Sequence, residues 1–170
     1  MKYAVDWDYS IEPMSDGDWE AVCAIYLEGI ATGNATFEIE VPDWATWDSG
    51  HRKDCRLVAK CGKKVLGWAA LSAVSQRRRY SGVAEVSVYV AAAARGKGIG
   101  KALLESLVTA SETAGFWTLQ ASVFPENEAS IALHQSCGFK KVGHRERIGA
   151  LHGIWHDTVV LERRSNVMGV

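Results

Sequence analysis

Two parts of the sequence carry residues whose types and spacing are suited to chemistry. The first is Arg95–Lys101, which reads Arg-Gly-Lys-Gly-Ile-Gly-Lys and so combines three glycines with three cations. Glycine has no side chain to keep a ligand away from the backbone N–H groups. The helix predicted to follow adds the positive end of its dipole, which favours anions. The run therefore predicts a loop that binds phosphate.

This run can be compared with three kinds of phosphate loop. A Walker A loop needs glycine where Arg95 stands and serine or threonine where Ala102 stands, so that pattern fails twice. A dinucleotide fingerprint that begins at Gly96 needs glycine where Lys101 stands, and it belongs after the first strand of a fold. The pattern Arg/Gln-x-x-Gly-x-Gly/Ala is matched from Arg95 onward. A flexible turn with solvated lysines is the alternative interpretation.

The second candidate is a carboxylate within an apolar strand. Val83–Val90 is rich in valine, and Glu85 lies inside it. Burying a carboxylate is costly unless it is paired or the strand borders a cleft. Alternation along a strand places Glu85, Ser87 and Tyr89 on one face. This polar stripe is suited to a general base, and a solvent-facing strand with ordinary polar residues is the alternative.

The elements that must position these residues alternate along the chain. Hydrophobic periodicity, caps and turn residues predict strands at residues 9–12, 56–60, 64–74, 83–90, 117–124, 139–142 and 156–161. The same signals predict helices at about residues 16–33, 44–53, 98–114 and 127–137. The glycine loop thus lies between a strand and a helix, and Asn127 is placed as an N-cap. Alternation of this kind predicts an α/β or α+β fold with a mixed sheet.

Length and charge limit the class of protein. A chain of 170 residues suits a single domain over residues 1–170, long enough to bury a core. Its 19 Lys+Arg and 20 Asp+Glu give a net charge of −1, whereas binding to nucleic acid normally needs a basic excess. The apolar run Val65–Val74 is too short for a membrane helix of ~20 residues. Met1–Asp6 lacks the apolar centre of a signal peptide. We therefore expect a cytoplasmic protein with no nucleic-acid or membrane partner.

Cysteine and tryptophan are the remaining features of the composition. The cysteines show no C-x-x-C spacing, so we expect reduced thiols and no metal site. The four positions are Cys23, Cys55, Cys61 and Cys137. There are seven tryptophans, of which Trp19, Trp117 and Trp155 suit core or interface positions. No role follows from the sequence for Trp7, Trp44, Trp47 and Trp68.

Taken in order, these motifs resemble the GNAT superfamily of N-acetyltransferases. The resemblance covers nearly the whole chain and is carried by Glu85–Val90, Arg95–Gly100, Pro125–Ser130, Leu133-His134 and Gly138-Phe139. Three further segments resemble the phosphinothricin and methionine sulfoximine N-acetyltransferase branch: Ile25-Tyr26, Ala35–Glu38 and Leu151–Asp157. The resemblance implies a central, mixed, mostly antiparallel twisted sheet flanked by helices. It also implies direct transfer of acetyl from acetyl-CoA to the α-amine of a small amino acid such as phosphinothricin, methionine sulfoximine or methionine sulfone.

Site residues follow from the resemblance by position. Glu85 is expected to be the general base, and His134 stands where many relatives carry a tyrosine that protonates the leaving thiolate. The residues expected to hold acetyl-CoA are Val88, Tyr89, Val90, Arg95, Gly96, Lys97, Gly98, Ile99, Gly100, Lys101 and Asn127. Those expected around the acceptor are Tyr26, Phe37, Arg77, Arg79, Tyr80, Glu85, Val86 and Ser87. Core packing is an equal alternative for Phe37, and a solvated loop is the alternative for the arginines.

One departure and two other functions stay open. Relatives often carry an arginine where Ser81 stands, so Arg77 or Arg79 takes over that role or the acceptor differs. A transferase for another amine, such as a polyamine, an aminoglycoside or a peptide N-terminus, is one alternative. An acyl-CoA-binding module without turnover is the other. The resemblance also implies a homodimer, which apolar residues such as Ile154 and Trp155 support.

Overall fold

The computed structural model describes residues 8–170, and within them the strands form one seven-stranded sheet. The order across the sheet is β1-β2-β3-β4-β5-β7-β6. Its strands are β1 (Ser10–Pro13), β2 (Arg56–Cys61), β3 (Lys64–Ala73), β4 (Val83–Val90), β5 (Thr118–Val123), β6 (Lys140–Leu151) and β7 (Ile154–Arg164). All neighbouring pairs are antiparallel except β4 and β5, which are parallel. The expectations about Met1–Asp6 and Trp7 concern residues outside the described range.

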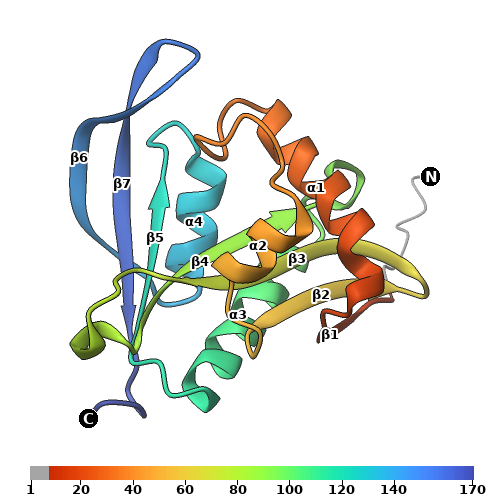
Figure 1. The fold of residues 1–170 in the computed structure, drawn as a ribbon, viewed down its shortest axis with the longest axis horizontal. Helices are drawn as coiled ribbons and strands as arrows, with labels where there is room; N and C mark the ends of the chain where they lie inside the picture. Colours follow the sequence, from red (N-terminus) through yellow and green to blue (C-terminus); the bar gives the residue numbers. More distant parts are fainter. Residues whose placement is uncertain (1–7) are drawn as a thin grey trace.

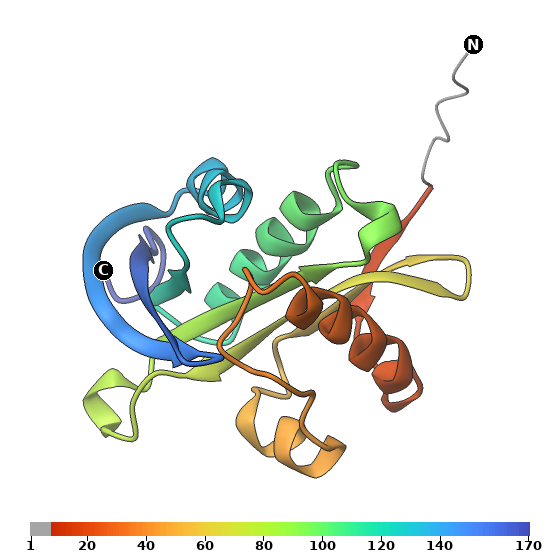
Figure 2. The same ribbon diagram turned by 90° about the horizontal axis from the view of Figure 1, so that it is seen from above.

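Helices cover both faces of this sheet, as Figures 1 and 2 show. The helices are α1 (Trp19–Ala31), α2 (Trp44–Gly50), α3 (Ile99–Thr113) and α4 (Glu128–Ser136). The first two lie on one face, and α3 and α4 lie on the other (Figure 2). Short 3-10 turns occur at Asp16–Asp18, Arg78–Tyr80 and Ala92–Ala94. Between residues 8 and 170, no helix is long and apolar enough to cross a membrane.

The main core lies between the sheet and α3. Leu103, Leu104 and Leu107 recur at helical spacing along α3, and each side chain is fully buried. They pack against apolar residues that alternate along β3, β4 and β5, among them Leu71 and Leu119. Each fully buried leucine contributes roughly 1.5–3 kcal/mol to stability. This packing fixes α3, and therefore the glycine loop before it, against the sheet.

An aromatic core on the other face explains most of the tryptophan excess. Trp47 and Trp68 are fully buried and meet edge to face, with ring centroids 5.7 Å apart. Trp44 stacks on Trp47 at 6.0 Å, and Trp19 lies 5.3 Å from both. The Arg56 guanidinium lies 5.0 Å from the Trp47 ring, a cation–π distance. These residues attach α1 and α2 to the sheet.

The two central parallel strands stay paired over a short length only. Register pairs join Val83 to Thr118, Ala84 to Leu119 and Glu85 to Gln120. Beyond Glu85 both strands continue, but they no longer pair with each other. Backbone groups on the facing edges are therefore free to bind a ligand that lies between the strands.

The structure corrects the bounds of three predicted elements. The predicted strands at residues 139–142 and 156–161 belong to a much longer hairpin, β6 with β7. Residues 143–149 are mostly polar and carry no apolar alternation. Pairing with β7 holds residues 143–145 and Gly149 in the sheet, whereas the ladder is irregular between Arg145 and Gly149, where Arg147 has a φ of 46°. The hairpin turns through His152 and Gly153, whose φ angles are 50° and 78°. Helix α2 ends at Gly50, earlier than the predicted residue 53.

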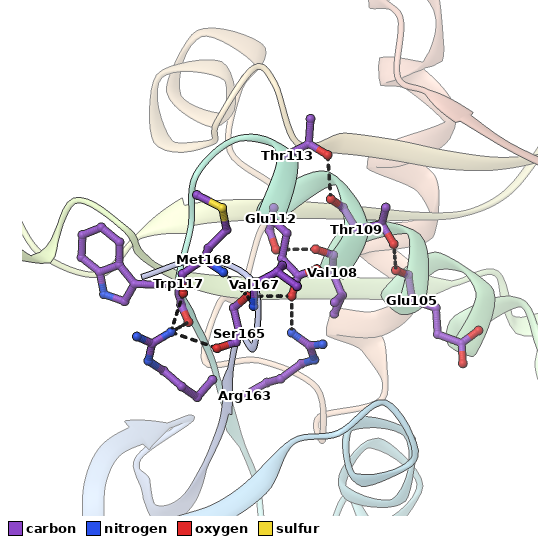
Figure 3. Close-up of polar contacts among 12 residues, drawn as sticks. Glu105, Val108, Thr109, Glu112, Thr113, Trp117, Arg163, Ser165, Val167 and Met168 are labelled. Atoms are coloured by element: carbon purple, nitrogen blue, oxygen red, sulfur yellow. Dashed lines mark hydrogen bonds and ion pairs between the residues drawn. The ribbon is translucent and has the colours of Figure 1, made fainter. Parts of the chain in front are cut away.

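The C-terminal end of α3 is fastened to the end of β7 (Figure 3). Glu112 accepts hydrogen bonds from Arg163 at 3.0 Å and from Ser165 at 2.9 Å. Burial alone raises the pKa of Glu112, but these bonds outweigh it, so the pKa lies below its usual value. Arg164 donates to the backbone oxygens of Trp117 and Met168. The residues at the end of β7 and after it therefore hold the C-terminal end of α3 in place. The glycine loop lies at the opposite end of this helix.

Candidate active site

A cleft of about 850 Å³ lies where β4 and β5 separate. Its walls come from α1, the segment after α1, strands β4 and β5, the start of α3 and helix α4. Most of the residues predicted for the site line it. They are Tyr26, Phe37, Glu85, Val86, Ser87, Val88, Tyr89, Val90, Arg95, Gly96, Gly98, Ile99, Gly100, Lys101, Asn127 and His134.

The glycine loop has the shape of an anion cradle. Gly96 and Gly98 have φ angles of 72° and 80°, which favour glycine, and the space where each would carry a Cβ is open. Gly98 is the N-cap of α3, so the free N–H groups of the first helical turn point from this end. Arg95 and Lys101 line the same part of the cleft, whereas Lys97 does not. The backbone donors and cations fit a pyrophosphate group.

Asn127 connects the two walls of the cleft. Its side-chain oxygen accepts from the Ser130 N–H at 3.2 Å, which is an N-cap of α4. Its amide nitrogen donates to the Asn34 carbonyl at 3.2 Å, in the segment that follows α1. The N-cap role is therefore seen directly, and a contact with the cofactor stays a prediction.

Glu85 lies at the fork between the two parallel strands. Its side chain is half-buried and lines the cleft. The Gln120 amide donates to Oε2 of Glu85 at 3.0 Å, and the Ser122 hydroxyl lies 3.5 Å from the same oxygen. Both donors orient the carboxylate without neutralising it, because neither carries a charge. The arrangement suits a general base at the edge of the cleft.

His134 is buried and held in one tautomer. Its Nδ1 lies 2.7 Å from the Ser130 carbonyl oxygen, which can only accept, so Nδ1 carries the proton. Burial lowers the pKa of His134 below its usual value, although the Ser130 bond works in the opposite direction. The resting imidazole is therefore neutral, with a lone pair on Nε2. In this state His134 must accept a proton before it can give one, and its part in the reaction stays a prediction.

The phenol side chains of Tyr26 and Tyr89 line the cleft next to each other. Tyr26 and Tyr89 lie 4.9 Å apart, and Tyr89 stacks on Trp68 at the same separation. Burial raises the pKa of both tyrosines, and the nearby Glu38 carboxylate adds to the effect. Gly29 makes this packing possible, since a Cβ there would lie 2.7 Å from the Tyr89 ring. Both phenols stay protonated at neutral pH.

The predicted acceptor arginines lie outside the cleft. Arg77, Arg79 and Tyr80 are exposed on the connection between β3 and β4, and none of them lines the cleft. A single 3-10 turn over Arg78–Tyr80 shapes this connection. It leaves the sheet at the end where Glu85 lies, because Ala73 and Ala84 form the last register pair before it. Phe37 does line the cleft and packs edge to face on Phe124 at 4.8 Å.

Several lining residues were missed by the sequence reasoning. Ser122 lines the cleft, and Gln120 contacts Glu85. Both could have been found, because Thr118, Gln120 and Ser122 alternate with apolar residues along their strand. His51, which follows α2, carries no comparable pattern.

Cys137 caps the C-terminal end of α4, and burial raises the pKa of its thiol. An unreactive thiol agrees with direct transfer.

Comparison with known proteins agrees with this geometry. The sequence matches the family described as "Acetyltransferase (GNAT) family" over residues 19–139. It is 35% identical to a phosphinothricin N-acetyltransferase of Alcaligenes faecalis, over 92% of this chain and 83% of that protein. It is 27% identical to an L-methionine sulfoximine/L-methionine sulfone acetyltransferase of Pseudomonas paraeruginosa, over 90% of this chain and 92% of that protein.

A solved structure shares the fold. It is a GNAT superfamily phosphinothricin acetyltransferase from Sinorhizobium meliloti in complex with acetyl-CoA. The TM-score is 0.83 at 32% identity, covering 95% of this chain and 90% of that chain. The fold, the glycine loop and these relatives together identify an acyltransferase. The chain belongs to the GNAT family of acetyltransferases.

Proposed function

We propose that the protein transfers acetyl from acetyl-CoA to the α-amine of a small amino acid related to phosphinothricin or methionine sulfoximine. The strongest support is the position of Glu85 relative to the glycine loop. The Glu85 carboxylate, which has no cationic partner among residues 8–170, lies at the fork of β4 and β5. It shares the cleft with a glycine loop that fits a pyrophosphate. The names of the relatives support the choice of acceptor.

The donor would be held along the fork. The backbone N–H groups of Gly98 and Gly100, with Arg95 and Lys101, would bind the pyrophosphate. The free backbone edge beyond Glu85 would pair with the pantetheine arm, which has amide groups of its own. The arm then runs toward Glu85. These contacts supply positioning, which accounts for much of the rate of a reaction between two bound substrates.

Glu85 would remove a proton from the acceptor ammonium, directly or through a water. The neutral amine can then attack the thioester carbonyl, forming the C–N bond. The nitrogen still carries one surplus proton at that stage. His134 has its lone pair on Nε2 and would accept this proton. It would then pass this proton to sulfur as the C–S bond breaks, which returns His134 to its neutral form. The proton taken by Glu85 is released to solvent, so each turnover that starts from the ammonium releases one proton.

Arg77 and Arg79 remain our candidates for the acceptor carboxylate. Within residues 8–170 their guanidinium groups make no ion pair, and their connection leaves the sheet beside the Glu85 end of the cleft. The connection would have to fold over the cleft to reach the acceptor. Arginine binds carboxylate in a bidentate way, so loss of either one should raise the KM of the acceptor.

We also propose that the whole chain acts as one domain and forms a homodimer through the β6–β7 hairpin. On this hairpin Val142, Ile148, Ile154 and Trp155 leave more than half of their surface exposed.

We place the protein in the cytoplasm, because its four cysteines are free, which fits a reducing compartment. Acetylation replaces the ammonium group of a toxic amino acid by a neutral amide, so resistance to such compounds is the proposed consequence.

An assay of CoA thiol release, with the product identified by mass, tests the proposal. Phosphinothricin, methionine sulfoximine and methionine sulfone should release thiol and yield N-acetyl products. Spermidine, kanamycin and an alanine-terminated peptide should not, because Glu38 and Glu85 are the only acidic residues of the described chain that line the cleft. Turnover of a polyamine or peptide alone would overturn the acceptor. Binding of acetyl-CoA without turnover of any amine would favour the non-catalytic alternative.

A further inference from the structure

His51 stands at the acceptor end of the cleft. The amide of the next residue, Arg52, donates to the Leu71 carbonyl at 2.8 Å, which ties this segment to the end of β3. Ser72 follows Leu71 and pairs in register with Glu85. His51, Ser72 and Glu85 all line the cleft. The imidazole therefore lies at the same end as the proposed base, away from the glycine loop.

Packing fixes the orientation of the ring. The imidazole stacks on Trp47 with centroids 4.2 Å apart and planes inclined by 18°. Its Nδ1 lies 2.7 Å from the Trp47 carbonyl oxygen. Because a carbonyl can only accept, Nδ1 is the donor and Nε2 holds the lone pair. Among the described residues Nε2 has no hydrogen-bond partner, and it is not one of the fully buried atoms without a partner.

The surroundings keep the ring uncharged. Burial lowers the pKa of His51, the Trp47 bond opposes that effect, and the Arg56 guanidinium lowers the pKa further. The same arginine donates to the His51 carbonyl at 2.8 Å, so its position is fixed. A neutral imidazole in this tautomer offers a ligand in the cleft one acceptor and no donor.

Resting on the function proposed above, we propose that His51 is a specificity-determining residue that selects acceptors with a hydrogen-bond donor on the side chain. The sulfoximine of methionine sulfoximine carries an N–H group, which can donate to Nε2. The sulfone replaces this N–H by oxygen, and an ionised phosphinate also has only acceptor oxygens. Both of these acceptors would place an oxygen lone pair against the lone pair of His51 Nε2. The carboxylates Glu38 and Glu85 line the same cleft and further disfavour the anionic phosphinate.

Comparing kcat/KM for sulfoximine and sulfone tests this proposal, since the two acceptors differ by one N–H group. The wild type should prefer the sulfoximine by about fivefold or more, the size expected for one hydrogen bond. His51→Phe should reduce the ratio to near one. His51→Gln should keep part of the preference, because a side-chain carbonyl can still accept. The KM of acetyl-CoA should stay the same in both variants.

The controls separate the possible failures. His144→Phe alters an exposed histidine outside the cleft and should keep the wild-type ratio. Equal kcat/KM for the two acceptors in the wild type would overturn the role of His51. So would an unchanged ratio in His51→Phe, or in His51→Gln if the phenylalanine variant does not fold. Absence of turnover with every amino acid would instead overturn the proposed function.

Discussion

Glu85 and Gln120 form the last register pair of the parallel strands β4 and β5, and the Gln120 amide lies 3.0 Å from Oε2 of Glu85. The pairing of β4 with β5 therefore ends at these two residues, and the Gln120 amide also orients the Glu85 carboxylate. Past this point the strands separate and the cleft opens. The position at which pairing ends thus decides where the base stands relative to the donor.

Replacing Glu85 by glutamine should abolish most turnover. The amide keeps the shape of the side chain but cannot take a proton at neutral pH, so kcat should fall by about 10²–10⁴-fold. The dissociation constant of acetyl-CoA should stay the same, because the loop that holds the donor is intact. Steady-state kinetics and calorimetric titration with acetyl-CoA measure the two quantities.

The control for this variant is Glu20→Gln, which changes an exposed carboxylate on α1 that lies outside the cleft. It should behave like the wild type. If Glu85→Gln retains the full rate, Glu85 has no part in the chemistry.

A side chain at Gly98 should weaken binding of the donor. The Cβ would enter open space, so Gly98→Asp brings a negative charge to the loop without a clash. The charge repels phosphate, and the KM of acetyl-CoA should rise about tenfold or more. The left-handed φ of 80° adds a stability cost of ~1–2 kcal/mol, which thermal unfolding measures.

Gly62→Asp is the matched control for Gly98→Asp. Gly62 also has a left-handed φ, of 58°, and open space at its Cβ, but it lies in the β2–β3 turn outside the cleft. This variant should lose similar stability and keep the KM of acetyl-CoA. Equal effects of the two variants on that KM would show that strain, and not phosphate repulsion, explains the result.

An aspartate at Trp155 should separate the proposed dimer. Trp155 is 63% exposed beside Ile154 on the hairpin, and burying a charge in an apolar interface is unfavourable. Sedimentation velocity should show a dimer for the wild type and a monomer for Trp155→Asp. Val167→Asp changes a side chain of similar exposure, 64%, outside the hairpin and should remain dimeric. A monomeric wild type would contradict the interface.

The elements around the glycine loop could be predicted because their signals are local. The strand expected at residues 83–90 is β4, and the helix expected at 98–114 is α3, Ile99–Thr113. Valine-rich alternation marks the first, and flanking glycines mark the second. The β6–β7 hairpin could not be predicted in the same way, because its polar residues follow no local strand pattern and its extent depends on pairing between the two strands.

The site itself depends on contacts between distant parts of the chain. Glu85 and His134 could be named from their positions in motifs, and both line the cleft. The tautomer of His134 follows from its distance to the Ser130 carbonyl, and no motif encodes it. His51 reaches the cleft only because Trp47 and the end of β3 hold it there. The exposed position of Arg77 likewise depends on how the β3–β4 connection turns.

Mild acid should destabilise the fold through two histidines, the buried His134 and the partly buried His51. Burial lowers the pKa of His51 and of His134 below 6.5, the value expected in the unfolded chain. Between the lowered pKa and 6.5, the unfolded state binds more protons than the folded state. The stabilisation is therefore complete above pH 6.5 and is lost as the pH falls through that window. Each group contributes at most about 1.4 kcal/mol per pH unit.

Urea unfolding at pH 7.5 and pH 5.5 measures this effect. Both pH values lie above the range where carboxylates titrate, so the difference reports on the histidines. His51→Asn and His134→Asn lower the stability at pH 7.5, but each should lose less between the two pH values than the wild type. His152→Asn is the control, since it removes an exposed histidine in a turn whose φ of 50° asparagine tolerates. The same pH dependence in all four proteins would show that neither His51 nor His134 is kept neutral by the fold.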